Sequence, residues 1–193
     1  MAKLESSLLN MFLSLTIICV CVGGILAGVN EFTRKSIERA KKTKLENALK
    51  DIVPKFDNSP SEEAYYGKIS EVDSLKIYPA KKAGKLVGLA VESNSIEGFG
   101  GEIKIIVGFD AEGKIMNYTV LQHAETPGLG DKMEYWFKTD KNRQNILGKN
   151  LRSGKLKVNI DGGDVDAITA ATISSRAFLD AVNRAYAATG TIW

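Results

Sequence analysis

The chain has 193 residues, a quarter of them charged, and a formal net charge of +3 at neutral pH. This length has room for one domain and an anchor. The near balance of charge, without a basic patch interleaved with aromatic residues, argues against nucleic-acid binding as the main activity. Both cysteines, Cys19 and Cys21, lie in an apolar run, and the rest of the chain holds one histidine, His123. That part therefore offers neither a Cys/His metal site nor a cysteine nucleophile.

The N-terminal segment is apolar, with no charged side chain between Leu8 and Val29. This length suffices for one helix across a bilayer. A secretory signal peptide is the alternative, but its apolar region is normally shorter and its start more basic. Here only Lys3 precedes the run, and Glu5 offsets it. The sequence therefore predicts a retained single-pass membrane anchor over residues 1–30.

A basic segment follows the anchor and contains Arg34, Lys35, Arg39, Lys41, Lys42 and Lys44. The positive-inside rule would place this side of the membrane in the cytoplasm. Residues 30–53 have the pattern of a helix that leaves the membrane and ends before Pro54. We therefore predict a juxtamembrane helix over residues 31–56 and a single domain over residues 57–193.

The predicted domain alternates strand patterns with turn signals. After a polar, loop-like stretch at 57–73, strands are predicted at 75–80, 86–93, 102–109 and 115–122, with a further strand at 155–160. The short connection Asp110–Gly113 indicates a hairpin and antiparallel pairing.

Helices are predicted at 133–138 and 174–188, and the second carries an apolar stripe of Phe178, Ala181, Val182, Ala185 and Tyr186. The predicted fold class is α+β. It consists of a twisted antiparallel sheet with packed helices, preceded by one N-terminal transmembrane helix.

The most informative segment directly precedes the last predicted helix and runs from Asp166 to Thr172 as Asp-Ala-Ile-Thr-Ala-Ala-Thr. Its small residues let a bulky group approach the backbone, and the free N–H groups of a helix start suit a phosphate. Thr172 supplies an oxygen that can carry the phosphate. The simpler interpretation is that Thr169 or Thr172 only caps the helix.

This segment resembles the flavin-attachment motif of the FMN-binding domain family, Asp-x-x-Ser/Thr-Gly/Ala-Ala-Thr. The resemblance implies that Thr172 is esterified to the phosphate of FMN by a flavin transferase that uses FAD. It also implies that Asp166, Thr169, Ala170 and Ala171 are recognition residues of the cofactor site. The family usually has Gly where this chain has Ala170, and Ala is strained there if φ is positive.

Two further segments resemble hallmarks of the same family. Residues 125–130 read Glu-Thr-Pro-Gly-Leu-Gly, a rigid turn of little bulk against which a flat ring can lie, although a plain connection fits the same residues. The resemblance implies that the flavin contacts Glu125, Thr126, Gly128, Leu129 and Gly130. Residues 98–101 resemble the family's Gly-Tyr-Gly-Gly segment, with Phe99 in place of Tyr. His123 is either a proton donor to reduced flavin or a structural residue.

Three motifs in family order behind a single anchor resemble the G subunits of Rnf electron-transport complexes. The resemblance implies a flavoprotein that relays electrons within an ion-translocating ferredoxin:NAD oxidoreductase, with no catalytic side chain of its own. Its partners would be other membrane and iron–sulfur subunits, the flavin transferase and the lipid bilayer. The resemblance places it in the inner (plasma) membrane with the flavin domain on the outer face, against the charge pattern.

Two alternatives remain open from the sequence. One is the C subunit of a sodium-pumping NADH:quinone reductase, which has the same chemistry. The other is a membrane-tethered sensory module that binds flavin without redox turnover, and a flavin spectrum that responds to reductant would argue against it.

Overall fold

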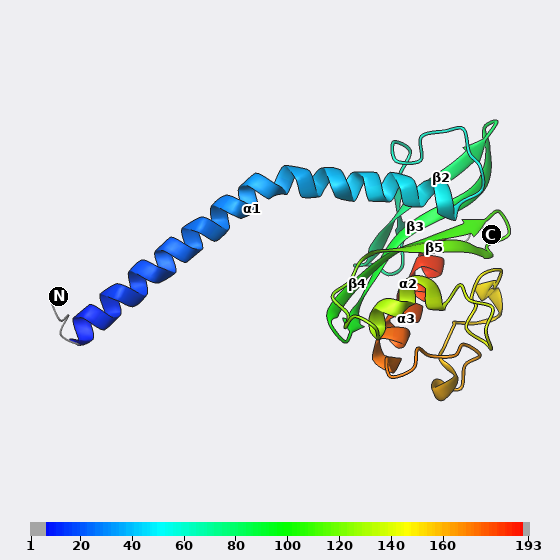
Figure 1. Ribbon diagram of the computed structural model, residues 1–193. Coiled ribbons are helices and arrows are strands. Elements are labelled where there is room, and N and C mark those ends of the chain that lie inside the picture. The colour runs from blue at the N-terminus through cyan, green and yellow to red at the C-terminus, as the bar shows by residue number, and fades with distance from the viewer. Residues whose placement is uncertain (1–6, 191–193) are drawn as a thin grey trace. The chain divides into compact units, whose positions relative to one another are not determined.

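A computed structural model describes residues 7–190 (Figure 1). The chain separates into two compact units, Met1–Thr43 and Lys44–Trp193. Helix α1 (Leu8–Ile52) runs without a break from the first unit into the second. The predicted anchor and juxtamembrane helix are thus one continuous helix. It ends two residues before Pro54, because a proline disfavours helical backbone in the residue that precedes it.

The first unit is the apolar part of α1. Its most apolar stretch has a mean hydropathy of 2.5, and none of that stretch is buried within the protein. Large apolar side chains such as Phe12, Ile18 and Leu26 are exposed along it. A helix that is apolar on all sides and exposed suits lipid surroundings, and its length and composition allow it to cross a membrane.

The second unit contains a five-stranded antiparallel sheet in which each strand pairs with its neighbours in sequence. The strands are β1 (Tyr65–Lys68), β2 (Ser74–Lys82), β3 (Lys85–Gly98), β4 (Gly101–Asp110) and β5 (Ile115–Gln122). The four strands predicted between residues 75 and 122 are confirmed, and β3 extends five residues further than predicted, to Gly98. This extension carries the chain to the Gly-Phe-Gly-Gly turn.

Two predictions in this unit were wrong. Residues 57–73 are not all loop, because β1 pairs with β2 from Tyr65↔Ile77 to Lys68↔Ser74. Residues 155–160 do not form a strand: Val158 makes an isolated bridge to Val165, and the short 3-10 helix η3 (Asn159–Asp161) follows. The alternation that indicated a strand reflects the burial of Leu156 and Val158 in the core.

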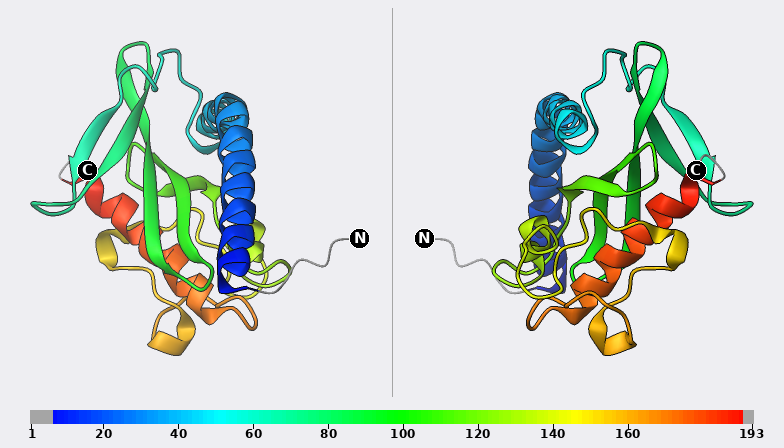
Figure 2. Two further views of the ribbon diagram at one scale, coloured as in Figure 1. Left: turned by 90° about the vertical axis from the view of Figure 1, so that its left-hand side faces the viewer. Right: turned by 90° about the vertical axis from the view of Figure 1, so that its right-hand side faces the viewer.

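The main core lies between the sheet and helix α3 (Thr172–Ala188), which runs along one face of the sheet (Figure 2). Phe178 of α3 stacks on Phe137 at 4.6 Å and meets the edge of Tyr118 at 4.8 Å. The Tyr118 hydroxyl donates to the carbonyl of Met133 in the short helix α2 (Met133–Trp136). Burial raises the pKa of Tyr118, so this hydroxyl stays protonated as the donor.

The last turns of α1 form a second hydrophobic cluster. Ala48, Leu49, Ile52 and Val53 pack with Tyr78, Ala80, Ala90 and Ile106 of the sheet. The approach is close at Gly108, where an added Cβ would lie 1.8 Å from the Ile52 carbonyl oxygen. Glycine is therefore required at this position, and the end of α1 is part of the domain core.

Candidate functional site

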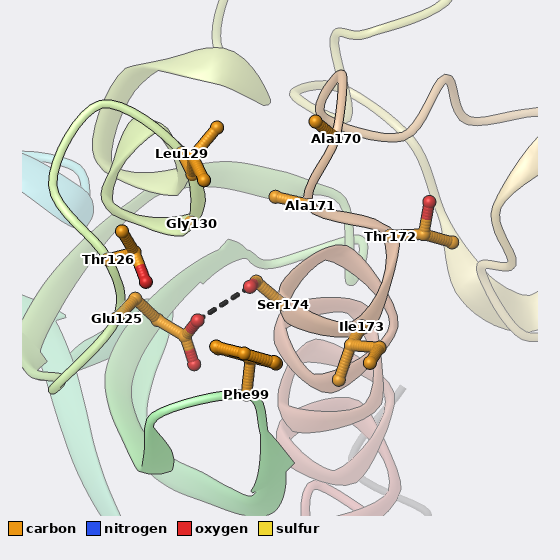
Figure 3. Close-up of a pocket in the computed structure, with 10 residues that line it drawn as sticks. All are labelled: Phe99, Glu125, Thr126, Leu129, Gly130, Ala170, Ala171, Thr172, Ile173 and Ser174. Atoms are coloured by element: carbon orange, nitrogen blue, oxygen red, sulfur yellow. Dashed lines mark hydrogen bonds between the residues drawn. The ribbon is translucent and has the colours of Figure 1, made fainter.

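Three segments that are distant in sequence meet at one pocket of about 390 Å³ (Figure 3). They are the turn between β3 and β4, the loop after β5, and the start of α3. The ten lining residues are Phe99, Glu125, Thr126, Leu129, Gly130, Ala170, Ala171, Thr172, Ile173 and Ser174. The pocket thus brings together all three motifs that the sequence indicated. Of the ten predicted site residues, Asp166, Thr169 and Gly128 do not line it.

The loop after β5 folds back through a tight turn. The N–H of Leu129 donates to the Thr126 carbonyl at 3.1 Å, and Gly128 has a φ of 78°. Proline followed by a residue at positive φ is typical of a type II turn, which explains Pro127-Gly128. The turn directs Gly130 into the site, where an added Cβ would lie 2.6 Å from both Glu125 Oε2 and Ser174 Oγ.

Glu125 connects the three segments of the pocket. Its side chain is buried, with the residue only 5% exposed. Oε1 accepts from the N–H of Gly100 at 3.1 Å, and Oε2 accepts from the Ser174 hydroxyl at 2.6 Å (Figure 3). Gly98 and Gly130 leave room for the carboxylate, because a Cβ on either would come within 2.6 Å of one of its oxygens. The glycines of two motifs therefore enclose a carboxylate that is hydrogen-bonded to the start of α3.

The start of α3 has no side-chain cap. Ala171 occupies the N-cap position, so the interpretation of Thr169 or Thr172 as the cap was wrong. Thr172 is the first residue of the helix and is half-buried at the pocket. The first N–H groups of a helix have no intrahelical acceptor and carry the positive end of its dipole. This end of α3 therefore presents an environment suited to an anion beside the Thr172 side chain.

Ala170 adopts a left-handed backbone with a φ of 62°. It belongs to a turn in which the N–H of Ala171 donates to the Ile168 carbonyl at 2.9 Å. A residue with a Cβ is strained in this region by about 1–2 kcal/mol. Glycine, which the family usually has here, would adopt this backbone without strain, whereas Ala170 is strained.

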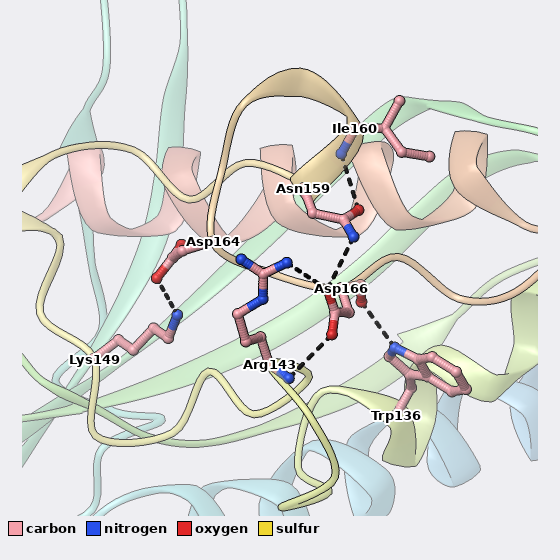
Figure 4. A network of polar contacts seen from close by, with 7 residues as sticks. All are labelled: Trp136, Arg143, Lys149, Asn159, Ile160, Asp164 and Asp166. Atoms are coloured by element: carbon pink, nitrogen blue, oxygen red, sulfur yellow. Dashed lines mark hydrogen bonds and ion pairs between the residues drawn. The ribbon is translucent and has the colours of Figure 1, made fainter.

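Asp166 lies outside the pocket lining, in a network that joins three loops (Figure 4). Its carboxylate accepts from the N–H of Arg143 at 3.1 Å and from Asn159 Nδ2 at 2.9 Å. The Arg143 guanidinium lies 3.4 Å from Oδ1, and Trp136 Nε1 donates to the Asp166 carbonyl at 3.0 Å. Asp166 therefore fixes the chain that leads to Thr172.

His123 is also outside the pocket lining. Its Nδ1 accepts from the N–H of Glu125 at 3.2 Å, and its Nε2 lies 3.6 Å from a carboxylate oxygen of Glu134. These contacts hold the start of the loop and favour the structural interpretation over that of a proton donor. Sequence reasoning missed Ser174 and Ile173 as lining residues, since the contact of Ser174 with Glu125 spans 49 positions.

Sequence similarity to known proteins shows the family to which the chain belongs. The model of the FMN-binding domain family matches residues 98–187, the span that contains all three motifs. Several relatives, each named as the G subunit of an ion-translocating oxidoreductase complex, cover most of the chain. The protein from Shewanella oneidensis is 36% identical over 90% of this chain and 85% of its own length.

The protein from Stutzerimonas stutzeri is 34% identical over 90% of this chain and 77% of its own length. That from Vibrio parahaemolyticus is 34% identical over 88% of this chain and 83% of its own length. The resemblance inferred from the motifs is confirmed. The chain belongs to the family of the G subunits of ion-translocating oxidoreductase complexes, and it contains an FMN-binding domain.

Proposed function

We propose that this chain is a membrane-anchored flavoprotein subunit of an ion-translocating ferredoxin:NAD oxidoreductase complex and relays electrons through FMN bound at the pocket. The observation that carries the proposal is the meeting of three family motifs at one pocket beside Thr172. FMN supplies the capacity to accept and release electrons, and the protein fixes its position and electrostatic environment. No side chain of this chain is assigned a catalytic role.

The pocket fits the cofactor in size and character. Its volume of about 390 Å³ lies within the range of small-molecule sites. Phe99 is 70% exposed in the described chain, and Leu129 and Ile173 are also exposed. These side chains offer apolar surface to an aromatic ring system. Phe99 lacks the phenol hydroxyl of the family's tyrosine, so its contribution is limited to contact by the ring.

We further propose that FMN is held by a phosphoester to Thr172. In this reaction the Thr172 oxygen forms a bond to the FMN phosphorus of FAD, the pyrophosphate bond of FAD breaks, and AMP leaves with the hydroxyl proton. A flavin transferase carries out the step. The support is the family motif and the position of Thr172 at an uncapped helix N-terminus, which favours the phosphate charge.

The remaining predicted residues have distinct proposed tasks. The pocket surface is formed in part by Thr126, Gly130 and Ala171. Ala170 adopts the left-handed backbone of the turn that precedes the helix. Asp166 and Gly128 act indirectly by shaping the two loops, and Thr169 is exposed and accessible to the transferase.

For location, we propose that residues 1–30 anchor the chain in the inner (plasma) membrane, that residues 31–56 form the juxtamembrane segment, which is helical as far as Ile52, and that the domain of residues 57–193 lies on the outer face. The apolar length of α1 supports the span, and the family resemblance supports the outer face. The basic residues between Arg34 and Lys44 oppose it, although the positive-inside rule is a bias that partner subunits can outweigh. The partners are the other membrane and iron–sulfur subunits.

A pair of reporters fused after Trp193 tests the orientation. A reporter that works only outside the cytoplasm is expected to be active there. Activity of a cytoplasmic reporter alone would reverse the proposed orientation and leave the flavin site unaffected.

Replacement of Thr172 tests the cofactor proposal. The chain produced together with a flavin transferase is expected to fluoresce after denaturation, and a peptide containing Thr172 is expected to gain FMN less one water. Thr172→Ala should abolish both signals. Thr139→Ala is the matched control, because Thr139 is exposed and lies outside the three motifs and the pocket lining, and it should retain attachment. Flavin that stays covalently bound to the Thr172→Ala protein would refute the assignment.

A further inference from the structure

The pocket contains one charged side chain. Among its ten lining residues only Glu125 is ionisable at neutral pH, and no lysine, arginine or histidine is present to balance it there. We propose that the Glu125 carboxylate lowers the reduction potential of the flavin by placing a fixed negative charge at its site. This inference rests on the proposed FMN site and extends it from binding to the control of electron energy.

Glu125 makes two hydrogen bonds through its carboxylate. Both carboxylate oxygens accept, one from the N–H of Gly100 and one from the hydroxyl of Ser174 at 2.6 Å. Charge-assisted hydrogen bonds of this kind are short. Ser174 is the third residue of α3, so the carboxylate is held at the positive end of the helix dipole. These contacts stabilise the charge without a cation that would cancel it.

The carboxylate is also fixed in position. Gly98 and Gly130 approach so closely that a Cβ on either would lie 2.6 Å from an oxygen of Glu125. The nearby glycine backbone and the hydrogen bonds to Gly100 and Ser174 hold the carboxylate in one position. Its charge therefore acts from a constant place.

The effect on the flavin follows from electrostatics. Each electron that arrives from the preceding carrier of the complex adds negative charge to the cofactor unless a solvent proton follows it. A buried negative charge disfavours this gain, and the interaction is stronger in a poorly solvated site than in water. The same pocket with a neutral side chain would hold a flavin that is easier to reduce. Glu125 thus raises the energy of the electrons that the relay passes on.

The test compares reduction potentials in the full-length, flavin-loaded protein. Glu125→Gln keeps the shape and one acceptor oxygen but removes the charge. Glu112→Gln removes the same charge at the opposite end of β4, roughly 30 Å away along a ten-residue strand. A spectroelectrochemical titration of the bound flavin is expected to give a more positive midpoint for Glu125→Gln only. Equal midpoints for the wild type and Glu125→Gln would overturn the proposal.

A second variant distinguishes charge from structural damage. Glu125→Asp retains the negative charge but shortens the side chain and disturbs its hydrogen bonds to Gly100 and Ser174, so the midpoint is expected to stay closer to that of the wild type than to that of Glu125→Gln. A shift in Glu125→Asp of the same sign and size as that in Glu125→Gln would show that disruption of the pocket, not charge, is responsible. Mass spectrometry of the wild type checks the cofactor separately, because absence of FMN there contradicts the proposed function, whatever the role of Glu125.

Discussion

Glu125 and Asp166 are both carboxylates of the family motifs, yet their surroundings are opposite. Glu125 lines the pocket, is buried, and has an N–H and a hydroxyl as partners. Asp166 lies outside the lining, its side chain is 20% exposed, and Arg143 balances its charge. Acidic residues of the family motifs therefore differ in their roles. One acidic residue faces the pocket, and the other holds a loop through its hydrogen bonds and its ion pair.

Among substitutions around Glu125, we expect the largest effect on stability at Gly130. Gly130→Ala places a Cβ 2.6 Å from Glu125 Oε2 and Ser174 Oγ, and overpacking of this kind costs about 1–3 kcal/mol. We expect a lower free energy of unfolding in urea and reduced retention of flavin in the pocket. Gly128→Ala is the control: it is strained by its positive φ but has open space around it. A larger loss of unfolding free energy and of flavin retention in Gly128→Ala than in Gly130→Ala would contradict the central place of Glu125.

Asp166→Asn tests the role of Asp166 in holding the loop that leads to Thr172. This change removes the charge that faces Arg143 and weakens the hydrogen bonds to Arg143 and Asn159. We expect a loss of about 0.5–1.5 kcal/mol in the free energy of unfolding, the scale of a typical intramolecular hydrogen bond. The reduction potential of flavin already attached should not change. A shift as large as that of Glu125→Gln would mean that the two carboxylates act alike.

The smallest effect is expected at a pair near the Asp166 loop. The Arg176 guanidinium binds both carboxylate oxygens of Asp161 at 2.7 Å and holds the pKa of Asp161 below its ordinary value. A lowered pKa in the folded state stabilises the protein above the unfolded pKa of about 3.9, and this stability is lost as pH falls through the folded pKa. The pair is largely exposed, so its contribution is small.

Thermal unfolding from pH 7 to pH 2 measures this contribution. The wild type should be slightly more stable than Asp161→Asn at pH 7, and the difference should disappear at the acidic end. A difference that persists at pH 2 would show that the pair contributes through packing. Added salt should reduce the difference at pH 7.

Local patterns explain which elements were predictable. The strands from β2 to β5 and helix α3 have apolar residues at the period of their own structure, which a sequence displays directly. Strand β1 was missed because its burial pattern shows no alternation and its pairing depends on β2. The segment around Leu156 and Val158 has the alternation of a strand but enters the core without a ladder of its own.

The site was predictable as three segments but not as one arrangement. From sequence alone, the motifs predict a site at Thr172 and at the loop from Glu125 to Gly130, and both segments line the pocket. The central position of Glu125 depends on contacts across 25 and 49 positions of the chain, to Gly100 and Ser174. No local pattern encodes such contacts. Likewise, the sequence indicates that Ala170 is strained only if φ is positive, and the structure supplies the angle.

The end of α1 has a practical consequence for preparing the domain in water. A chain shortened to begin after Phe56 would lose Ala48, Leu49 and Ile52, and the side chains of Tyr78, Ala90 and Ile106 that they cover would face solvent. Uncovered apolar surface of this kind promotes aggregation. A chain that begins at Lys44, where the second compact unit starts, keeps these covering residues and omits the apolar segment. Residues that follow the anchor in sequence thus decide whether the domain remains soluble once the anchor is removed.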